Sequence, residues 1–307
     1  MTRCRLLIAL ALIVALGLRI YALGRASLWA DEAFTLLVGR NSFMDIWQQT
    51  ILNDYNPPLI YLLYRLWIPL IGGLPIEFGA RLLPVVFDLA AIYVTARIMH
   101  ERLGCDAAAM TAWLMALSPF EVEAARTARG YSLMLLLTTV CLHYADRFFA
   151  ENKNRPTDGE KSHPLVGKSA NYLLIAGAAL VLALYTHYYA FFLFPAILAL
   201  ALWHRRPRLT GYFLLPIVFY IPWFPVFFHH LKKGNAMIQP LSPERFVRSI
   251  LAIFAGQTFF LSQPGVSVAQ MALLATLAIG LFVLVFRLIR TFRAHGESDH
   301  VANLLTQ

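Results

Sequence analysis

Acidic residues are scarce in this sequence. Asp and Glu together number only 17 of 307 residues, and all charged residues together make up 14%. Apolar residues make up 59%. A soluble domain cannot bury that much apolar surface, so the composition predicts an integral membrane protein.

Cysteine is nearly absent as well. The three cysteines, Cys4, Cys105 and Cys141, lie in or beside apolar segments, and none has the spacing of a metal ligand. We therefore expect no disulfide and no zinc site. No cofactor follows from the sequence, although a divalent cation is compatible with it.

The formal net charge of +9 has an explanation that does not involve nucleic acid. Lys and Arg recur between hydrophobic segments instead of forming a basic cluster on a soluble domain, as the positive-inside rule predicts. The short basic segment Met1–Arg5 then places the N-terminus in the cytoplasm. The apolar run Leu6–Leu23 is as long as a spanning helix requires, which favours a retained first span over a cleaved signal peptide.

The hydrophobic pattern predicts an all-α polytopic membrane protein with about eight transmembrane helices. The expected spans are Leu6–Leu23, Arg81–Met99, Cys105–Phe120, Tyr131–Phe149, Ala170–Tyr185, Ala190–Trp203, Leu209–Phe228 and Val266–Phe286. Leu59–Ile71, at about 13 residues, is too short to cross ~30 Å of hydrocarbon. We expect it and Phe246–Leu261 to be interfacial or re-entrant helices in the first and last exterior loops.

These segments define the expected organisation of the chain. A transmembrane domain covers residues 1–290, with an exterior loop at 25–80 and a cytoplasmic linker at 150–169, and a cytoplasmic tail covers 291–307. The exterior loop includes a predicted surface helix over Ser42–Asn53.

Two adjacent acids, Asp31 and Glu32, follow the first predicted span. A carboxylate at a membrane surface can act as a general base on a substrate that stays anchored in the bilayer. The alternative is that both acids only favour the positive end of a helix through Ala33–Gly39.

Several cations come from separate loops of the same predicted exterior face. Arginine at a membrane surface suits bidentate capture of phosphate. The alternative is that these cations pair with nearby acids or snorkel among lipid headgroups. Asp88, seven positions after Arg81, is expected to pair with it on one helix face. The cations that come from these separate loops are Arg40, Arg65, Arg81, Arg126, Arg129, Lys232 and Lys233.

Six short motifs occur in a characteristic order between about Met1 and Trp223. With them the chain resembles the bacterial GT-C glycosyltransferases, the glycosyltransferase family 39-like group of the dolichyl-phosphate-mannose protein mannosyltransferases and the lipid A aminoarabinose transferase. The motifs are Asp31-Glu32, Asn56-Pro57-Pro58-Leu59, Arg81-Leu82-Leu83-Pro84, Ser118-Pro119-Phe120, Ala128-Arg129-Gly130-Tyr131-Ser132-Leu133 and Tyr185-Thr186-His187-Tyr188-Tyr189.

The resemblance implies an inverting transferase in the cell inner membrane. Its donor would be a polyprenyl-phosphate-linked hexose or pentose, and its acceptor an unidentified glycan, lipid or protein on the periplasmic side. Asp31 would be the catalytic base, with Glu32 as its electrostatic or hydrogen-bonding support. The expected phosphate-binding residues are Arg81, Arg126 and Arg129, and the expected substrate-binding residues are Asn56, Tyr131 and His187.

The chain also departs from these relatives. They usually carry His where this chain has Asn56, and commonly an acid where it has Thr127. They usually have more spans, so the chain is expected to be C-terminally short. A non-catalytic polyprenyl-phosphate carrier or flippase-like protein, or an inactive truncated relative, is therefore the alternative function.

Overall fold

The computed structural model describes residues 2–152 and 167–234, all within one compact unit, Met1–Pro240. Within these two ranges the chain forms helices and no strands. The predicted interfacial segment Phe246–Leu261, the predicted span Val266–Phe286 and the predicted tail 291–307 lie outside the described residues.

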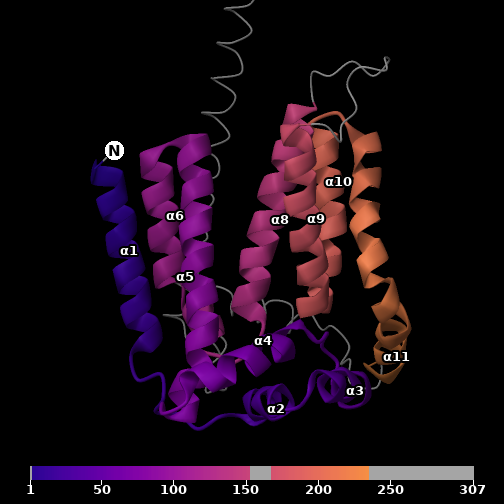
Figure 1. Cartoon of the computed structure of the whole chain (residues 1–307). Coiled ribbons are helices and arrows are strands. Elements are labelled where there is room, and N and C mark those ends of the chain that lie inside the picture. Colours follow the sequence, from indigo (N-terminus) through magenta and orange to yellow (C-terminus); the bar gives the residue numbers. More distant parts are fainter. Residues whose placement is uncertain (1, 153–166, 235–307) are drawn as a thin grey trace, which may run out of the picture. The chain divides into compact units, whose positions relative to one another are not determined.

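Most of the helices run between the two ends of this unit (Figure 1). Polar contacts join α5, α8 and α10 at one end: Asp146 contacts Arg102, and His204 Nε2 lies 2.7 Å from Asp146 Oδ1. This is the end predicted to be cytoplasmic, and the chain direction alternates between the two ends as the sequence predicts. The helices are α1 (Thr2–Ile20), α5 (Ile76–Leu103), α6 (Cys105–Leu117), α8 (Tyr131–Glu151), α9 (Lys168–Thr186), α10 (Leu193–Trp203), and η3 (Pro207–Trp223) continued by α11 (Phe224–Gly234).

Four stretches of the described residues are long and apolar enough to cross a membrane. They are Ile76–Leu103, Tyr131–Glu151, Lys168–Thr186 and Pro207–Lys232. The apolar helices Cys105–Leu117 and Tyr188–Trp203 are shorter, and α1 carries three arginines in its 19 residues. The all-helical membrane character is thus confirmed, whereas eight spans remain a prediction.

Two different kinds of packing hold the helices together. Alanines on α1, α5 and α6 let these helices approach closely around Ile92, as small residues do between membrane helices. Aromatic side chains instead fill the core among α8, α9, α10 and η3, where Phe148 and Phe213 are fully buried.

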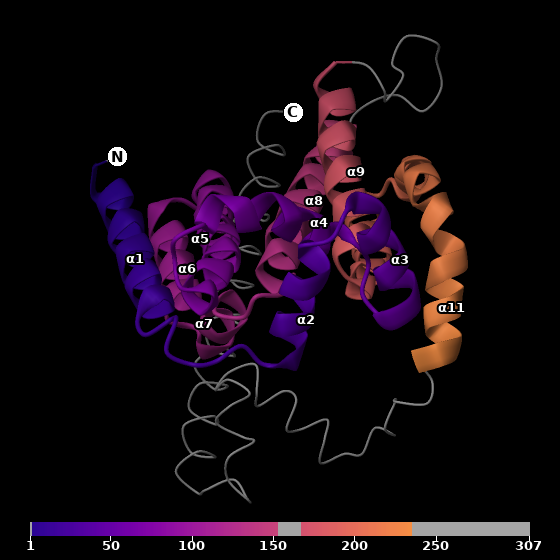
Figure 2. The same cartoon turned by 60° about the horizontal axis from the view of Figure 1, so that its bottom comes forward.

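The remaining helices gather at the end opposite the Asp146 contacts, and Figure 2 brings this end forward. They are α2 (Ala30–Gly39), α3 (Phe43–Asn53), α4 (Leu59–Trp67), its extension η1 (Ile68–Ile71), η2 (Tyr188–Phe192) and α7 (Pro119–Ala125). The predicted helix at Ser42–Asn53 is confirmed, and Ser42 caps it by accepting a hydrogen bond from Asp45 N at 3.2 Å. Gly39 lets α2 lie against α4, because a Cβ there would come within 2.8 Å of Tyr64 Cβ.

The predicted Arg81–Asp88 pair is wrong. Asp88 instead receives a hydrogen bond from Arg19 Nε on α1 at 2.5 Å, and both side chains are fully buried. Arg81 binds Glu32 on α2. Two turns of helix separate Arg81 from Asp88 by about 10 Å along the axis, so partners on neighbouring helices are nearer.

Glu121 on α7 lies close to the Arg19–Asp88 pair. Burial, followed by the charge of Asp88, raises the pKa of Glu121 to about 7. Asp88 Oδ1 is buried and accepts no hydrogen bond within the described residues. A protonated Glu121 is the acid that can supply one.

The raised pKa predicts that stability falls as the pH rises from about 4.5 to about 7. Over this range the unfolded state releases the Glu121 proton while the folded state retains it, so rising pH favours unfolding. Glu121→Gln should remove this part of the pH dependence and raise the melting temperature at pH 8. Thermal unfolding in detergent at pH 5 and pH 8 measures the effect, and an identical pH dependence in wild type and variant would contradict it.

Candidate functional site

The buried part of the site is an ion pair between Glu32 and Arg81. Glu32 Oε1 accepts from Arg81 Nε at 2.9 Å and from Ala128 N at 2.8 Å. Glu32 Oε2 accepts from Arg81 Nη2 at 2.6 Å and from Trp29 N at 3.3 Å. The four bonds occupy both carboxylate oxygens and join α2, α5 and the segment that leads into α8.

All the hydrogen-bond donors of the Arg81 guanidinium are used within the protein. Besides binding Glu32, its Nη1 donates to Leu23 O at 2.9 Å and to Ala26 O at 2.8 Å, and its Nη2 donates to Ser27 O at 3.0 Å. These contacts use all five N–H donors of the guanidinium. The phosphate-binding role predicted for Arg81 would require breaking them, so the geometry favours a structural role.

Asp31 differs from its neighbour Glu32 in the exposure and in the hydrogen bonding of its carboxylate. Its side chain is 50% exposed, compared with 1% for Glu32. Its carboxylate accepts no hydrogen bond within the described residues, while its backbone oxygen accepts one from Thr35 Oγ1 at 2.7 Å. The backbone of Asp31 is therefore fixed, and the carboxylate is accessible.

Arg129, two residues before α8 begins, lies beside Asp31. Nη1 donates to Thr35 Oγ1 at 3.1 Å, to Tyr61 OH at 3.3 Å and to Asp31 O at 3.4 Å. Nε and Nη2 make no hydrogen bond among the described residues, and Nη2 lies 4.0 Å from Asp31 Oδ2. One buried cation therefore presents unused donors beside one exposed carboxylate.

Arg126, the third arginine of the predicted phosphate clamp, does not join this pair. Its Nη1 donates to Leu18 O, near the end of α1, at 3.4 Å. The described contacts thus bring Arg129 to Asp31 but place Arg126 against α1.

Asp54 is a site residue that the sequence reasoning missed. It is buried after α3 and accepts hydrogen bonds from Tyr55 N at 2.7 Å and from the hydroxyl of Tyr61, which in turn accepts from Arg129. Burial raises the pKa of Asp54, and its hydrogen bonds and Arg129 act in the opposite direction. The signal in the sequence was an acid, rare in this chain, two positions before Asn56.

Asn56 contacts this acid. Its Nδ2 donates to Asp54 Oδ1 at 3.3 Å. Among the described residues, the amide predicted to bind substrate therefore supports the buried acid behind the site.

The other two predicted substrate-binding residues form an aromatic rim. The rings of Tyr131 and His187 are 6.3 Å apart, and Tyr189 lies 4.4 Å beyond His187. Tyr131 and Tyr189 are exposed. Burial, and then the charge of Arg129, lowers the pKa of His187, so its ring is neutral at pH 7 with Nδ1 accepting from Tyr189 N at 3.2 Å.

Gly130 lets this rim approach Arg129. A Cβ at Gly130 would come within 2.9 Å of Thr186 Cγ2, so the start of α8 lies directly against the end of α9. The segment that carries His187 is thereby placed beside the segment that carries Arg129.

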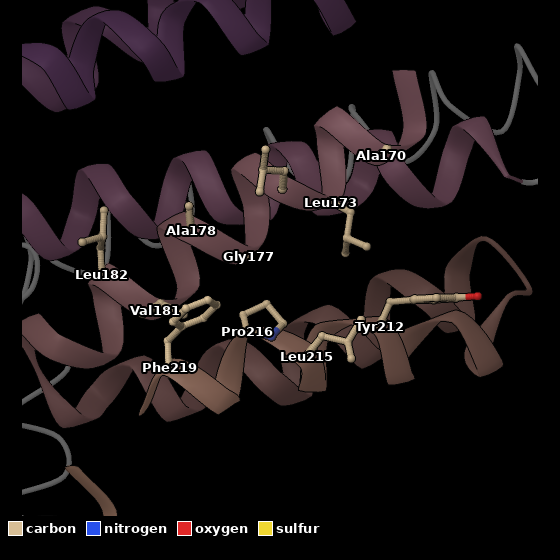
Figure 3. Close-up of a pocket in the computed structure, with 11 residues that line it drawn as sticks. Ala170, Leu173, Gly177, Ala178, Val181, Leu182, Tyr212, Leu215, Pro216 and Phe219 are labelled. Atoms are coloured by element: carbon tan, nitrogen blue, oxygen red, sulfur yellow. The ribbon is translucent and has the colours of Figure 1, made fainter. Parts of the chain in front are cut away.

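A cavity of about 560 Å³ lies between α9 and η3 (Figure 3). Apolar side chains such as Leu173, Val181 and Phe219 line it, and Tyr212 is the residue with a polar side-chain atom on its wall. None of the charged site residues reaches it, so it can hold hydrocarbon but supplies no acid or base.

A divalent cation was compatible with the sequence. In the described part of the chain, no group of three or more His, Cys, Asp or Glu side chains could hold a metal ion.

No protein-family model matches the sequence, and no curated protein matches it either.

Proposed function

We propose that this chain is an inverting glycosyltransferase that takes a hexose or pentose from a polyprenyl phosphate and acts on the extracytoplasmic face of the inner membrane. The observation that carries the proposal is the exposed Asp31 carboxylate beside the half-unused guanidinium of buried Arg129. A base for an acceptor hydroxyl and a cation for a phosphate are the two groups that such a transfer requires.

In this reaction the acceptor hydroxyl oxygen attacks the anomeric carbon while its proton passes to Asp31. The bond between that carbon and the phosphate oxygen breaks, and the electron pair leaves with the polyprenyl phosphate. Arg129 Nε and Nη2 stabilise the charge that builds on the phosphate. A retaining route needs a second carboxylate about 5 Å away that is free to attack, and the oxygens of Glu32 are already occupied.

In the proposed reaction the aromatic rim of Tyr131, His187 and Tyr189 binds the sugar. Flat faces beside a polar centre are typical of such sites. Because Nδ1 of neutral His187 accepts from Tyr189 N, its Nε2 carries the proton, and this N–H donates no hydrogen bond among the described residues. The eight-span topology and the side of the membrane belong to the same proposal. A reporter that is active only outside the cytoplasm tests that side when fused after Thr127.

Transfer by the purified protein in proteoliposomes is the direct test. Polyprenyl-phosphate sugars are supplied, and mass spectrometry detects released polyprenyl phosphate together with a glycosylated acceptor. Comparing envelope glycans of cells with and without the protein identifies the acceptor. A carrier would bind polyprenyl phosphate and lose this ability when Arg129 changes, but would tolerate the loss of Asp31.

Arg129→Lys should weaken donor binding about tenfold while preserving the charge. Lysine has no planar fork of donors, so it cannot satisfy Thr35 and Tyr61 and also present two N–H groups to a phosphate. Titration of polyprenyl phosphate into nanodiscs measures the change.

Arg65→Lys is the matched control. Arg65 also lies at this end and donates to Arg40 O and Asn41 O, away from Asp31. If both variants bind like the wild type, Arg129 is not a donor-phosphate ligand.

A further inference from the structure

We propose that Asp54 is a positioning residue that holds Arg129 in the orientation that binds the donor phosphate, acting through the hydroxyl of Tyr61. This inference rests on the proposed function and goes beyond it, because Asp54 makes no hydrogen bond or ion pair with Asp31 among the described residues and reaches Arg129 through Tyr61.

The hydrogen bonds run in one direction, from Arg129 to Tyr61 and from Tyr61 to Asp54. Asp54 Oδ2 accepts the proton of the Tyr61 hydroxyl. That leaves the lone pairs of the Tyr61 oxygen for Arg129 Nη1, which donates to it at 3.3 Å. Without an acceptor at Asp54, the hydroxyl can turn its proton toward Arg129, and donor would then face donor.

Arg129 is linked to two acids, directly to Asp31 and through the Tyr61 hydroxyl to Asp54. Its Nη2 lies 4.0 Å from Asp31 Oδ2, longer than the 2.7–2.9 Å of a charge-assisted hydrogen bond. Asp54, by way of Tyr61, holds the other terminal nitrogen of the same guanidinium, Nη1. The Tyr61 contact thus keeps Arg129 from closing onto Asp31, and a closed pair would occupy both the cation and the base.

The two residues that hold Arg129 in this way are both buried. Tyr61 is fully buried and Asp54 is 8% exposed. Tyr55 N and Asn56 Nδ2 also hold the Asp54 carboxylate, so its position is fixed from several directions. A hydrogen bond held this way can determine a side-chain position more strictly than an exposed one.

Two variants break the chain of contacts, and a third preserves it. Tyr61→Phe and Asp54→Ala should each raise the KM for the donor and the Kd for polyprenyl phosphate about tenfold, the order expected when a hydrogen bond to a charged group is lost. The double variant should show little further loss, because both changes release the same arginine. Asp54→Asn retains an acceptor oxygen for Tyr61 and should recover most of the affinity.

Tyr64→Phe is the matched control, one turn along α4. Tyr64 is equally buried, and its hydroxyl donates to Ala80 O at 2.9 Å and makes no hydrogen bond with Arg129 in the described part of the chain. Its loss should lower stability and leave the KM unchanged. A structural role alone would lower the folded fraction, and with it the maximal rate, without changing the KM or the Kd.

The two proposals fail in different ways. If the wild type binds polyprenyl phosphate but transfers no sugar, the transferase proposal fails, and the Kd values still test Asp54. If the wild type transfers sugar while Tyr61→Phe and Asp54→Ala keep the KM and Kd of Tyr64→Phe, the positioning role of Asp54 is refuted.

Discussion

Asp31→Asn should lower sugar transfer by at least about a hundredfold, since general-base catalysis typically contributes about 10²–10⁴-fold. The amide has nearly the same shape as the carboxylate but cannot accept the proton of the acceptor hydroxyl. Binding of polyprenyl phosphate should change little, because Thr35 and Tyr61, and not the Asp31 side chain, hydrogen-bond the Arg129 guanidinium. Initial rates in proteoliposomes, with the donor Kd measured in parallel, test this.

The same variant should fold normally. The Asp31 side chain is half exposed and accepts no hydrogen bond among the described residues, and changes at such surface positions usually stay within about 0.5 kcal/mol. Asp45→Asn on α3 is a suitable control, since Asp45 is also an acid near the start of a helix at this end and binds only Ser42 among the described residues. Turnover by Asp31→Asn close to that of the wild type would exclude Asp31 as the base.

The sequence predicted the elements of the site better than their roles. Short motifs marked Asp31, Glu32 and Arg129, and all three lie at one end of the helices. Roles depend on which side chains are buried, and adjacent helical residues point about 100° apart. Glu32 shares the buried stripe of α2 with Thr35 and Leu36, whereas Asp31 does not. The spacing of Glu32 three and four residues before Thr35 and Leu36 could therefore have predicted that Glu32 is buried and Asp31 is exposed.

The partners of the arginines could not be read from the sequence. Arg81 binds an acid 49 positions away, and Arg19 binds one 69 positions away. A single sequence carries no record of which helices lie side by side. The cations of the predicted exterior face therefore suggested a group of phosphate ligands. Of the three arginines of the predicted clamp, Arg81 uses all its donors within the protein, Arg126 donates to Leu18 O on α1, and Arg129 lies beside Asp31.

Glu32→Gln should have the largest effect on stability, reducing the free energy of unfolding by about 3–5 kcal/mol, as when one partner of a buried ion pair is removed. The side-chain oxygen of the glutamine can still accept from Arg81 Nε and Ala128 N. The amide nitrogen, however, would face Arg81 Nη2 and Trp29 N, which are both donors. Asp31→Asn, the same chemical change one residue earlier, is the matched control. Equal small losses of stability in the two variants would mean that both acids only favour the start of α2.

Arg81→Lys distinguishes the ion pair from a simple loss of charge. Lysine keeps the charge but has three donors on one atom, too few for Glu32 and the carbonyls of Leu23, Ala26 and Ser27 together. It should therefore destabilise the fold nearly as much as Glu32→Gln, and the double variant should lose less than the sum of the two. Because neither residue acts on substrate in the proposed reaction, transfer per folded molecule should fall far less than in Asp31→Asn. Full additivity of the two losses would contradict the interaction of Glu32 with Arg81 as the source of the stability.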